Sequence, residues 1–397
     1  MEEIYEGKVE EVDNLGNGII RLNNMVVFIK GCFKDEEILY KIERKEKRFM
    51  KGTLFKVIKG SPKRKTLPCK YFYNCGGCNM LHLLKDEELL YKTNYIKDLF
   101  KEYKVNDIVT VNEYNYRNKV TLHVKNGTLG YFMEHTNTLI EIDKCLLLEN
   151  KINDVIKYLK TVAVKEVTKI IIKKSNYDDK IMLIIFGSID KNTLENIVLN
   201  KNIDTLYIND TLIKGEKYIK EVVFDKVYLV GPNTFFQVNT YVTEKLYNFI
   251  KEEVKTSKKL LDLYCGVGSI SIFLHENLEN VKGVEIVKEA IMLANKNKDI
   301  NKAYNCKFLC GDSKIIKNEY YDTVIVDPPR SGLSKDVITN INNMHINKMI
   351  YVSCNPKTLK RDIITLNKTY DIISITPFNM FPKTCDVECV CIMKLKK

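Results

Sequence analysis

The sequence predicts an α/β protein in which a Rossmann-like domain follows a small antiparallel β-barrel and an α+β central domain. Three observations carry this prediction. Residues 230–397 alternate apolar strands with helical stretches, as parallel α/β domains do. Residues 1–59 hold short apolar runs separated by glycine-containing turns, which is typical of a small barrel. Residues 60–229 begin with a cysteine-rich segment and continue with β-rich runs and weaker helical patterns. We therefore place domains at 1–59, 60–229 and 230–397.

The charge of the chain favours a polyanionic partner. Lys and Arg number 63 and Asp and Glu 51 among 397 residues, so the net charge is +12. Part of the excess is concentrated within residues 41–65, where Glu43 and Glu46 are the only acids. Basic residues at this density suit phosphate neutralisation. The basic residues of this stretch are Lys41, Arg44, Lys45, Lys47, Arg48, Lys51, Lys56, Lys59, Lys63, Arg64 and Lys65.

The cellular context follows from what the sequence lacks. The first residues do not have the basic and apolar regions of a signal peptide, and no apolar run approaches membrane-spanning length. Twelve cysteines in such a chain indicate thiols, metal ligands or catalysis rather than disulfides. We expect a cytoplasmic protein that is monomeric and makes no membrane contact.

The first strands of the last domain carry the residues of a nucleoside site. Residues 259–263 form an apolar strand that runs into a turn with Gly266 and Gly268, where the backbone can pass close to a small molecule. A second strand ends at Glu285, 23 residues after Asp262, a spacing that suits a carboxylate bound to ribose hydroxyls. Asp312 follows a third strand, where an acid commonly meets an adenine edge. These strand ends predict a Rossmann-like cofactor site.

The next strand ends predict methylation at carbon. Asp327 ends a buried strand and is followed by Pro-Pro-Arg330, and Cys354 stands at the end of the following strand. A uracil C5 carbon is too weakly nucleophilic to take a methyl group from a sulfonium unaided. Addition of a thiolate to C6 makes C5 reactive, and a base must then remove the C5 proton. Asp386 and Glu388 face the same side of a predicted strand, and either can be that base.

A metal or cluster site is predicted in the cysteine-rich segment. Cys69, Cys75 and Cys78 form a C-x5-C-x2-C pattern that needs a fourth soft ligand. Four thiolates can hold either zinc or an iron–sulfur cluster. Two glycines, Gly76 and Gly77, let backbone amides approach sulfur closely, which favours the cluster. A helix is predicted after this segment, over residues 85–103.

Several motifs together resemble the RNA uracil-C5 methyltransferase family. They are Asp262-Leu-Tyr-Cys-Gly-Val-Gly, Asp327-Pro-Pro-Arg-Ser-Gly, Ser353-Cys-Asn-Pro-Lys-Thr-Leu-Lys-Arg-Asp, Phe381-Pro-Lys-Thr followed by Val-Glu388, and Gly231-Pro-Asn-Thr-Phe-Phe-Gln-Val-Asn. The resemblance implies that Cys354 is the nucleophile and Glu388 the base. It also implies that Gln237, Tyr264, Glu285 and Asp327 contact S-adenosyl-L-methionine, with Asp312 as a further contact to the adenine.

The resemblance extends to the rest of the chain. Cys145 matches the distal cysteine of the family's iron–sulfur branch, so that Cys69, Cys75, Cys78 and Cys145 would hold a 4Fe–4S cluster. Residues 1–59 resemble a TRAM domain, the RNA-binding barrel of members that act on ribosomal RNA. The implied function is methylation of C5 of a uridine in 23S ribosomal RNA, at a non-helical site from which the base can be extruded.

The chain departs from the family at one catalytic position. Members usually carry His before the Val-Glu pair, where this chain has Asp386. A second carboxylate there would either raise the pKa of Glu388 or face solvent. Two other functions remain within the same resemblance, a transfer-RNA uridine-C5 methyltransferase and a non-catalytic TRAM RNA-binding protein. A radical S-adenosylmethionine enzyme fits less well, because such enzymes use C-x3-C-x2-C and leave one iron open.

Overall fold

The computed structural model describes residues 3–134, 136–162, 164, 166–315 and 319–397. The chain divides into two compact units, each assembled from separate stretches of sequence. The first unit comprises Met1–Tyr95, Leu129–Cys145 and Phe381–Cys385. The second comprises Ile96–Thr128, Leu146–Met380 and Asp386–Lys397. Five residues close to the carboxyl terminus therefore belong to the amino-terminal unit.

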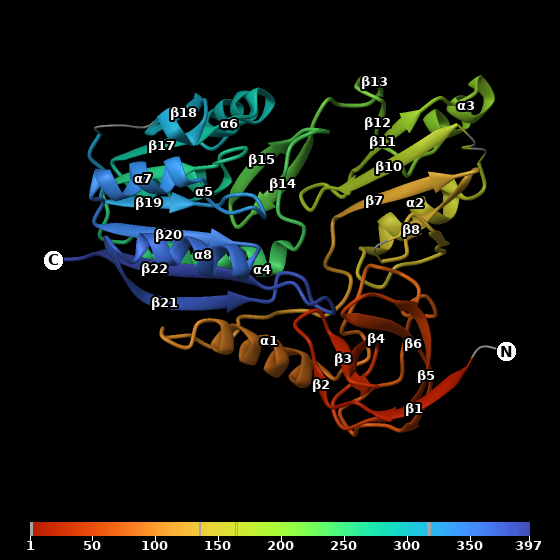
Figure 1. The fold of residues 1–397 in the computed structure, drawn as a ribbon. Coiled ribbons are helices and arrows are strands. Elements are labelled where there is room, and N and C mark those ends of the chain that lie inside the picture. Colours follow the sequence, from red (N-terminus) through yellow and green to blue (C-terminus); the bar gives the residue numbers. More distant parts are fainter. Residues whose placement is uncertain (1–2, 135, 163, 165, 316–318) are drawn as a thin grey trace. The chain divides into compact units, whose positions relative to one another are not determined.

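Over residues 1–59, where a small antiparallel barrel was expected, the first unit contains a curled sheet (Figure 1). Its strands run in the order β1-β5-β6-β4-β3-β2, and most of the pairs are antiparallel. The pair β4·β6 is parallel. The bounds are β1 Ile4–Lys8, β2 Glu11–Val12, β3 Asn17–Leu22, β4 Met25–Lys30, β5 Glu37–Lys45 and β6 Phe49–Lys59.

The alternation of side chains along these strands gives the sheet two different faces. Val27 and Ile29 on β4 are fully buried and pack with Ile38 and Tyr40 of β5 into one core cluster. Their neighbours in sequence point to the other face, because successive residues of a strand alternate sides. Phe28, for example, is only partly buried. The curled sheet thus encloses its core on one side and presents mixed aromatic and charged residues on the other.

The remainder of the first unit is a helix, a strand pair and the cysteine-rich segment. Helix α1 begins at Lys85 as predicted but ends at Leu99, four residues before the expected end. Its buried face includes Glu88 and Lys92, both charged. Strands β8 (Thr128–Phe132) and β9 (Leu139–Glu141) pair with each other in antiparallel fashion.

The central part of the second unit is a mixed sheet in which the strands follow the order β13-β12-β11-β10-β7. The apolar runs 120–124, 170–173 and 181–186 lie inside its strands, and 227–230 lies in the hairpin β14·β15. The bounds are β7 Lys119–Lys125, α2 Asn150–Leu159, β10 Val167–Lys174, β11 Ile181–Gly187, α3 Lys191–Leu199, β12 Thr205–Ile208, β13 Thr211–Lys214, β14 Ile219–Val223 and β15 Lys226–Val230.

The last part of the second unit is the open α/β sheet predicted for residues 230–397 (Figure 1). Its order is β18-β17-β16-β19-β20-β22-β21, parallel from β18 to β20 and antiparallel at β22 and β21. The bounds are α4 Thr240–Glu253, β16 Lys259–Leu263, α5 Ser269–Leu274, β17 Asn280–Glu285, α6 Lys288–Ile300, β18 Cys306–Cys310, β19 Thr323–Val326, α7 Lys335–Met344, β20 Lys348–Ser353, α8 Pro356–Leu366, β21 Tyr370–Phe378 and β22 Glu388–Leu395.

This strand order determines where a ligand can bind. The chain leaves β16 toward β17 and β18, and later returns to the other side of β16 to form β19 and β20. In open α/β sheets, a crevice forms at the carboxyl ends of the strands where the order reverses. Here that point lies between β16 and β19, the strands that precede Tyr264 and Asp327.

Within the described ranges, no helix has the length and apolar character needed to cross a membrane.

Candidate active site and cysteine cluster

The turn after β16 is built for close approach of a ligand to the backbone. Tyr264, Gly266 and Gly268 have φ angles of 65°, 53° and 80°, in the left-handed region that glycine adopts readily. A Cβ atom on Gly268 would lie 2.7 Å from the ring of Phe308, so a larger residue does not fit there. The amide of Gly266 donates a hydrogen bond to Oε2 of Glu285 at 3.2 Å.

A small cavity lies beside this turn. Six of the residues that line it are Phe235, Gln237, Asp262, Tyr264, Gly266 and Asp327. Burial raises the pKa of Asp262 to about 7, even though Ser271 donates a hydrogen bond to its carboxylate at 2.6 Å. The other oxygen of Asp262, Oδ1, is buried and has no hydrogen-bond partner among the described residues. An unsatisfied acceptor in a cavity of backbone, aromatic and acidic groups suits the polar edge of a nucleoside.

The structure places the five predicted cofactor residues around this turn, though not all of them line the cavity. Gln237, Tyr264 and Asp327 line it, whereas Glu285 is held at the rim by the Gly266 amide. Asp312 is exposed and accepts a hydrogen bond from the backbone of Lys314 at 3.0 Å. Its charge still raises the pKa of Tyr264, although burial contributes more.

The candidate nucleophile and base lie at the same sheet edge. Cys354 directly follows β20, and Glu388 begins β22, which pairs with β20 through Ser353 and Cys389. Burial raises the pKa of the Cys354 thiol to about 12, and the charges of Glu388 and Asp327 add to the shift. Burial and the charge of Asp327 also raise the pKa of Glu388 well above its usual range. The three groups are thus close enough for the charge of one to oppose the ionisation of the next.

Arg330 and Asp386 flank this group. Nη2 of Arg330 lies 3.0 Å from Oδ2 of Asp386, and both side chains are partly exposed. The guanidinium partly offsets the rise in the pKa of Cys354, and Asp386 contributes to the raised pKa of Glu388. Asp386 adds to the raised pKa of Glu388 and is also 39% exposed, so the structure shows both features expected for an acid in place of the family's histidine.

Sequence reasoning missed the role of a carboxylate that connects the loop after Asp327 to the helix after Cys354. Asp362 on α8 is buried and accepts hydrogen bonds from the hydroxyl of Tyr351 at 2.7 Å and from the amide of Leu333 at 2.8 Å. It lies against Gly332, where a Cβ atom would come within 2.6 Å of Oδ2. The loop after Asp327 is therefore fixed to the helix that follows Cys354. The sequence signal that could have revealed it is an acid at a position where the helical pattern of α8 calls for an apolar, buried residue.

The four cysteines predicted to bind a cluster lie together in the first unit. Burial raises the pKa of Cys78, and the charges of Cys145, Cys75 and Cys69 each raise it further. The amide of Gly77 donates to Sγ of Cys75 at 3.3 Å, the approach of an amide to sulfur that the diglycine was expected to allow. The hydroxyl of Tyr71 donates to Asp143 at 2.6 Å and thereby connects the cysteine loop to the segment that ends at Cys145.

The thiols of Cys69, Cys75, Cys78 and Cys145 are not gathered into a ligand set for one ion. In the described part of the chain, no group of three or more His, Cys, Asp or Glu side chains converges as a ligand set for one ion. A tetrahedral zinc site requires thiolates about 2.3 Å from a common centre. The charges of the four thiols nevertheless act on one another, as the raised pKa of Cys78 shows.

A buried ionic network holds the segment that leads to the candidate base. Glu88 on α1 lies between two lysines, with its oxygens 3.0 Å from Nζ of Lys92 and 2.8 Å from Nζ of Lys383. The amide of Lys383 also donates to Glu88 at 2.8 Å. Its carbonyl accepts from the amides of Asn79 and Met80, which directly follow Cys78, each at 3.0 Å. Phe381–Cys385 is thus fixed to α1 and to the cysteine loop three residues before Glu388.

Comparison with known proteins agrees with this geometry. The model of the tRNA (uracil-5-)-methyltransferase family matches residues 189–314 and 312–396. An RNA methyltransferase of Clostridium acetobutylicum is 31% identical, over 98% of this chain and 96% of its own length. One from Staphylococcus aureus strain MSSA476 is 29% identical, over 99% and 98%.

A solved structure also aligns along nearly the whole chain. It is Pyrococcus abyssi tRNA (uracil-54, C5)-methyltransferase in complex with S-adenosyl-L-homocysteine, with 25% identity and a TM-score of 0.81. The alignment covers 98% of this chain and 100% of that one. The fold is thus that of an S-adenosylmethionine-dependent α/β methyltransferase with a curled amino-terminal sheet. The chain belongs to the RNA uracil-5-methyltransferase family, as the sequence motifs indicated, and it is an RNA methyltransferase.

The buried network yields a stability prediction. Glu88→Leu would leave the ammonium groups of Lys92 and Lys383, which are 1% and 0% exposed, without their shared carboxylate. Removal of one partner from a buried pair costs about 3–5 kcal/mol of unfolding free energy. Urea titration followed by circular dichroism should therefore show a clearly lower midpoint. The control is Glu87→Gln, which removes a surface pair with Lys63 that is worth less than about 1 kcal/mol. Equal midpoints for the two variants would contradict the prediction.

Proposed function

We propose that this protein methylates C5 of a uridine in 23S ribosomal RNA by covalent catalysis, with Cys354 as the nucleophile and Glu388 as the base. The observation that carries the proposal is the meeting of Cys354, Glu388 and Asp327 at one buried sheet edge, where they perturb one another's pKa. Strongly shifted ionisable groups at the point where the strand order reverses are typical of a catalytic site. Uracil-5-methyltransferase activity in the family requires a thiol and a base in that place.

The chemistry assigns one bond change to each residue. The thiol of Cys354 first loses its proton to solvent. The thiolate then adds to C6 of the uracil, and the C5–C6 electron pair becomes an enolate. C5 then takes the methyl group, and the C5 proton passes to the carboxylate of Glu388. The electron pair of that C–H bond restores the C5–C6 double bond and expels the Cys354 thiolate. S-adenosylmethionine supplies the methyl group on a sulfonium and leaves as S-adenosylhomocysteine.

The shifted pKa values fit the order of these steps. Without substrate, burial and the neighbouring carboxylates keep a proton on Cys354. Arg330 is the nearby cation that opposes this effect and favours the thiolate. Once sulfur is bonded to C6 it carries no charge, so it no longer opposes an ionised Glu388. Formation of the adduct therefore prepares the base for the step in which it is needed.

The cofactor would be held by the residues around the β16 turn. Gln237, Tyr264 and Asp327 line the cavity, and Glu285 is fixed at its rim. We assign the ribose contacts to Glu285 and a contact at the adenine end to Asp312. Asp262, whose buried Oδ1 has no hydrogen-bond partner among the described residues, also lines this cavity.

We also propose that Cys69, Cys75, Cys78 and Cys145 hold a 4Fe–4S cluster. The support is the mutual charge effect of the four thiols and the amide of Gly77 that donates to Cys75. With all four irons ligated, such a cluster has no open coordination position, and its role in the chain is structural. The domains 1–59, a TRAM barrel, 60–229 and 230–397 remain our proposed functional division of a cytoplasmic, monomeric enzyme.

The choice of RNA has a second candidate. The match to the Pyrococcus abyssi enzyme, which its name describes as acting on uracil-54 of tRNA, extends over 98% of this chain. That alignment includes the curled amino-terminal sheet, so this sheet does not separate ribosomal from transfer RNA targets. Transfer RNA is therefore the alternative substrate, and the assignment of ribosomal RNA rests on the sequence resemblance to the family's iron–sulfur branch, which includes Cys145.

The release step gives the first prediction for this site. Glu388→Gln should still form the bond to C6 but stall before elimination, so that a protein–RNA adduct accumulates on a denaturing gel. Cys354→Ala should form no adduct and transfer no methyl group, while retaining S-adenosylhomocysteine binding within about twofold by calorimetry. Asp386→Asn is the matched comparison, since it changes a neighbouring carboxylate in the same loop. Accumulation of the adduct in Asp386→Asn rather than Glu388→Gln would transfer the role of base to Asp386.

The proposed cluster gives the second prediction. Protein purified without oxygen should be brown and contain about four irons per chain. Cys75→Ser should lose most of this iron, whereas Cys32→Ser, which changes a buried thiol in the same unit, should keep it. A colourless protein that carries zinc, or equal iron in both variants, would refute the cluster assignment.

The proposed RNA target gives the third prediction. Mass spectrometry of RNA from a strain that lacks this protein should show loss of 5-methyluridine from one or more positions of 23S ribosomal RNA. Addition of the purified enzyme and S-adenosylmethionine should restore it. Loss from transfer RNA with unchanged ribosomal RNA would instead establish the second candidate.

A further inference from the structure

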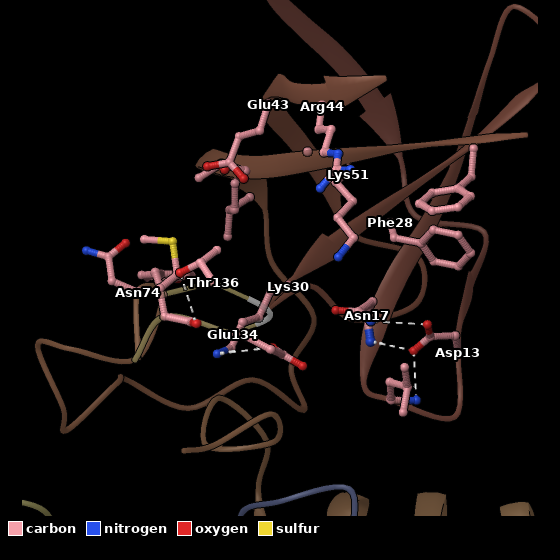
Figure 2. A pocket seen from close by; sticks show the side chains of 17 residues that line it. Asp13, Asn17, Phe28, Lys30, Glu43, Arg44, Lys51, Asn74, Glu134 and Thr136 are labelled. Carbon is pink, nitrogen blue, oxygen red and sulfur yellow. Dashed lines mark hydrogen bonds and ion pairs between the residues drawn. The ribbon is translucent and has the colours of Figure 1, made fainter. Parts of the chain in front are cut away.

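A second cavity, of about 390 Å³, lies in the first unit against the outer face of the curled sheet (Figure 2). Strands β3 to β6 form one wall. Residues 73–74, Met133, Glu134 and Thr136 contribute to the lining from other stretches of the same unit. A volume of this size lies within the range of small-molecule sites. None of the four cysteines and none of the proposed catalytic residues lines it, although Tyr73 and Asn74 belong to the loop between Cys69 and Cys75.

The wall of this cavity combines aromatic and cationic side chains. Phe28 on β4 and Phe49 on β6 pack edge to face, with ring centroids 5.8 Å apart. Lys51 pairs in register with Phe28 and lies two residues after Phe49, so all three side chains project from the same face. Figure 2 shows the ammonium group of Lys51 pointing into the space between Lys30 and Asn17. An aromatic wall with a cation beside it suits a flat ring with polar edges.

The charges around the cavity argue against a free phosphate as its occupant. Three cations, Lys30, Arg44 and Lys51, face three acids, Asp13, Glu43 and Glu134. Lys30 lies 3.8 Å from Glu134 and donates to the carbonyl of Cys75 at 2.6 Å. These charges balance formally, which favours a neutral group with donors and acceptors over an isolated anion.

Polar groups for hydrogen bonding to such a ring are already fixed in place. The carboxylate of Asp13 accepts from the amides of Leu15 and Asn17 at 2.9 and 2.8 Å and from the side chain of Asn17 at 3.1 Å. This turn holds both side chains at the edge of the cavity (Figure 2). Preorganised donors and acceptors lower the entropy cost of binding a base.

Phosphate-binding groups are abundant just outside the cavity. Lys45 ends β5, and the connection from β5 to β6 carries Lys47 and Arg48; all three are exposed. An RNA strand that placed a base in the cavity would therefore have cations available for its backbone. A protein partner would not need this combination of balanced pocket and basic border.

We propose that this cavity binds one unpaired base of the substrate RNA, at a position other than the methylated uridine. The inference rests on the proposed function, because it takes the same RNA as the occupant. The base stacks on Phe28 and Phe49, and the polar edge meets Lys51 and the Asp13–Asn17 turn. The cavity thereby adds a second point of recognition, which distinguishes the correct RNA from others that merely expose a uridine.

The test is a double-mutant cycle between protein and RNA. Unpaired nucleotides of the substrate RNA are replaced one at a time by abasic residues, and dissociation constants are measured by filter binding. With the unmodified protein, one position other than the target should weaken binding about tenfold when it lacks its base. With Phe49→Leu, binding should be about tenfold weaker and insensitive to that same replacement. Lys51→Gln should show the same insensitivity and preserves the aromatic wall.

The control is Phe55→Leu, which removes an exposed ring from the same strand, outside the cavity. It should bind as the unmodified protein does and keep the response to the abasic position. The inference is overturned if Phe49→Leu and Lys51→Gln respond to every abasic position like the unmodified protein, or if Phe55→Leu alone loses the response. If the inference fails in this way while Glu388→Gln still traps RNA, the proposed function stands without it. Absence of any trapped RNA would instead count against the proposed function.

Discussion

The carboxyl edge of the parallel sheet is the constraint on which the site depends. Four parallel strands, β16, β17, β19 and β20, end side by side, and their last residues bring together groups that are far apart in sequence. Asp327 and Cys354 meet there, and β22 returns in the antiparallel direction to add Glu388. Glu388 is buried and Asp327 and Cys354 are partly buried, so the charge of one group opposes the ionisation of the next. In the proposed mechanism, this mutual opposition would let a single thiol and a single carboxylate act in sequence rather than at once.

Much of this edge could be predicted from the sequence because the signal is local. An apolar run that ends in Gly, Asp or Cys shows both a buried strand and the residue at its end. Strands that end at Glu285 or just before Tyr264, Asp327 and Cys354 were all found in this way. Parallel strands place such residues at one edge, so proximity followed from topology. Gln237 and Cys145 had no such signal, and they came from the family resemblance alone.

The interactions that join distant segments could not be read from the sequence. Glu88 and Lys383 are separated by 295 residues, and neither stands in a pattern that predicts a buried ion pair. Asp362 on α8 accepts hydrogen bonds from Leu333 and Tyr351. The sequence does not show that these two residues lie beside its side of the helix. The assignment of residues 381–385 to the first unit was also missed, since the strand pattern around them belongs to the last domain. The cavity beside Phe28 was missed because alternation predicts two faces but not what a face binds.

The most direct test of the account is to locate the covalent bond itself. RNA that carries 5-fluorouridine at the target position cannot lose a proton from C5, so the adduct should persist after methyl transfer. Incubation with this RNA and S-adenosylmethionine, followed by nuclease and protease digestion, should yield one modified peptide. Mass spectrometry should place a methylated fluorouridine nucleotide on Cys354. A nucleotide attached to another cysteine, or methylated RNA without any adduct, would contradict covalent catalysis by Cys354.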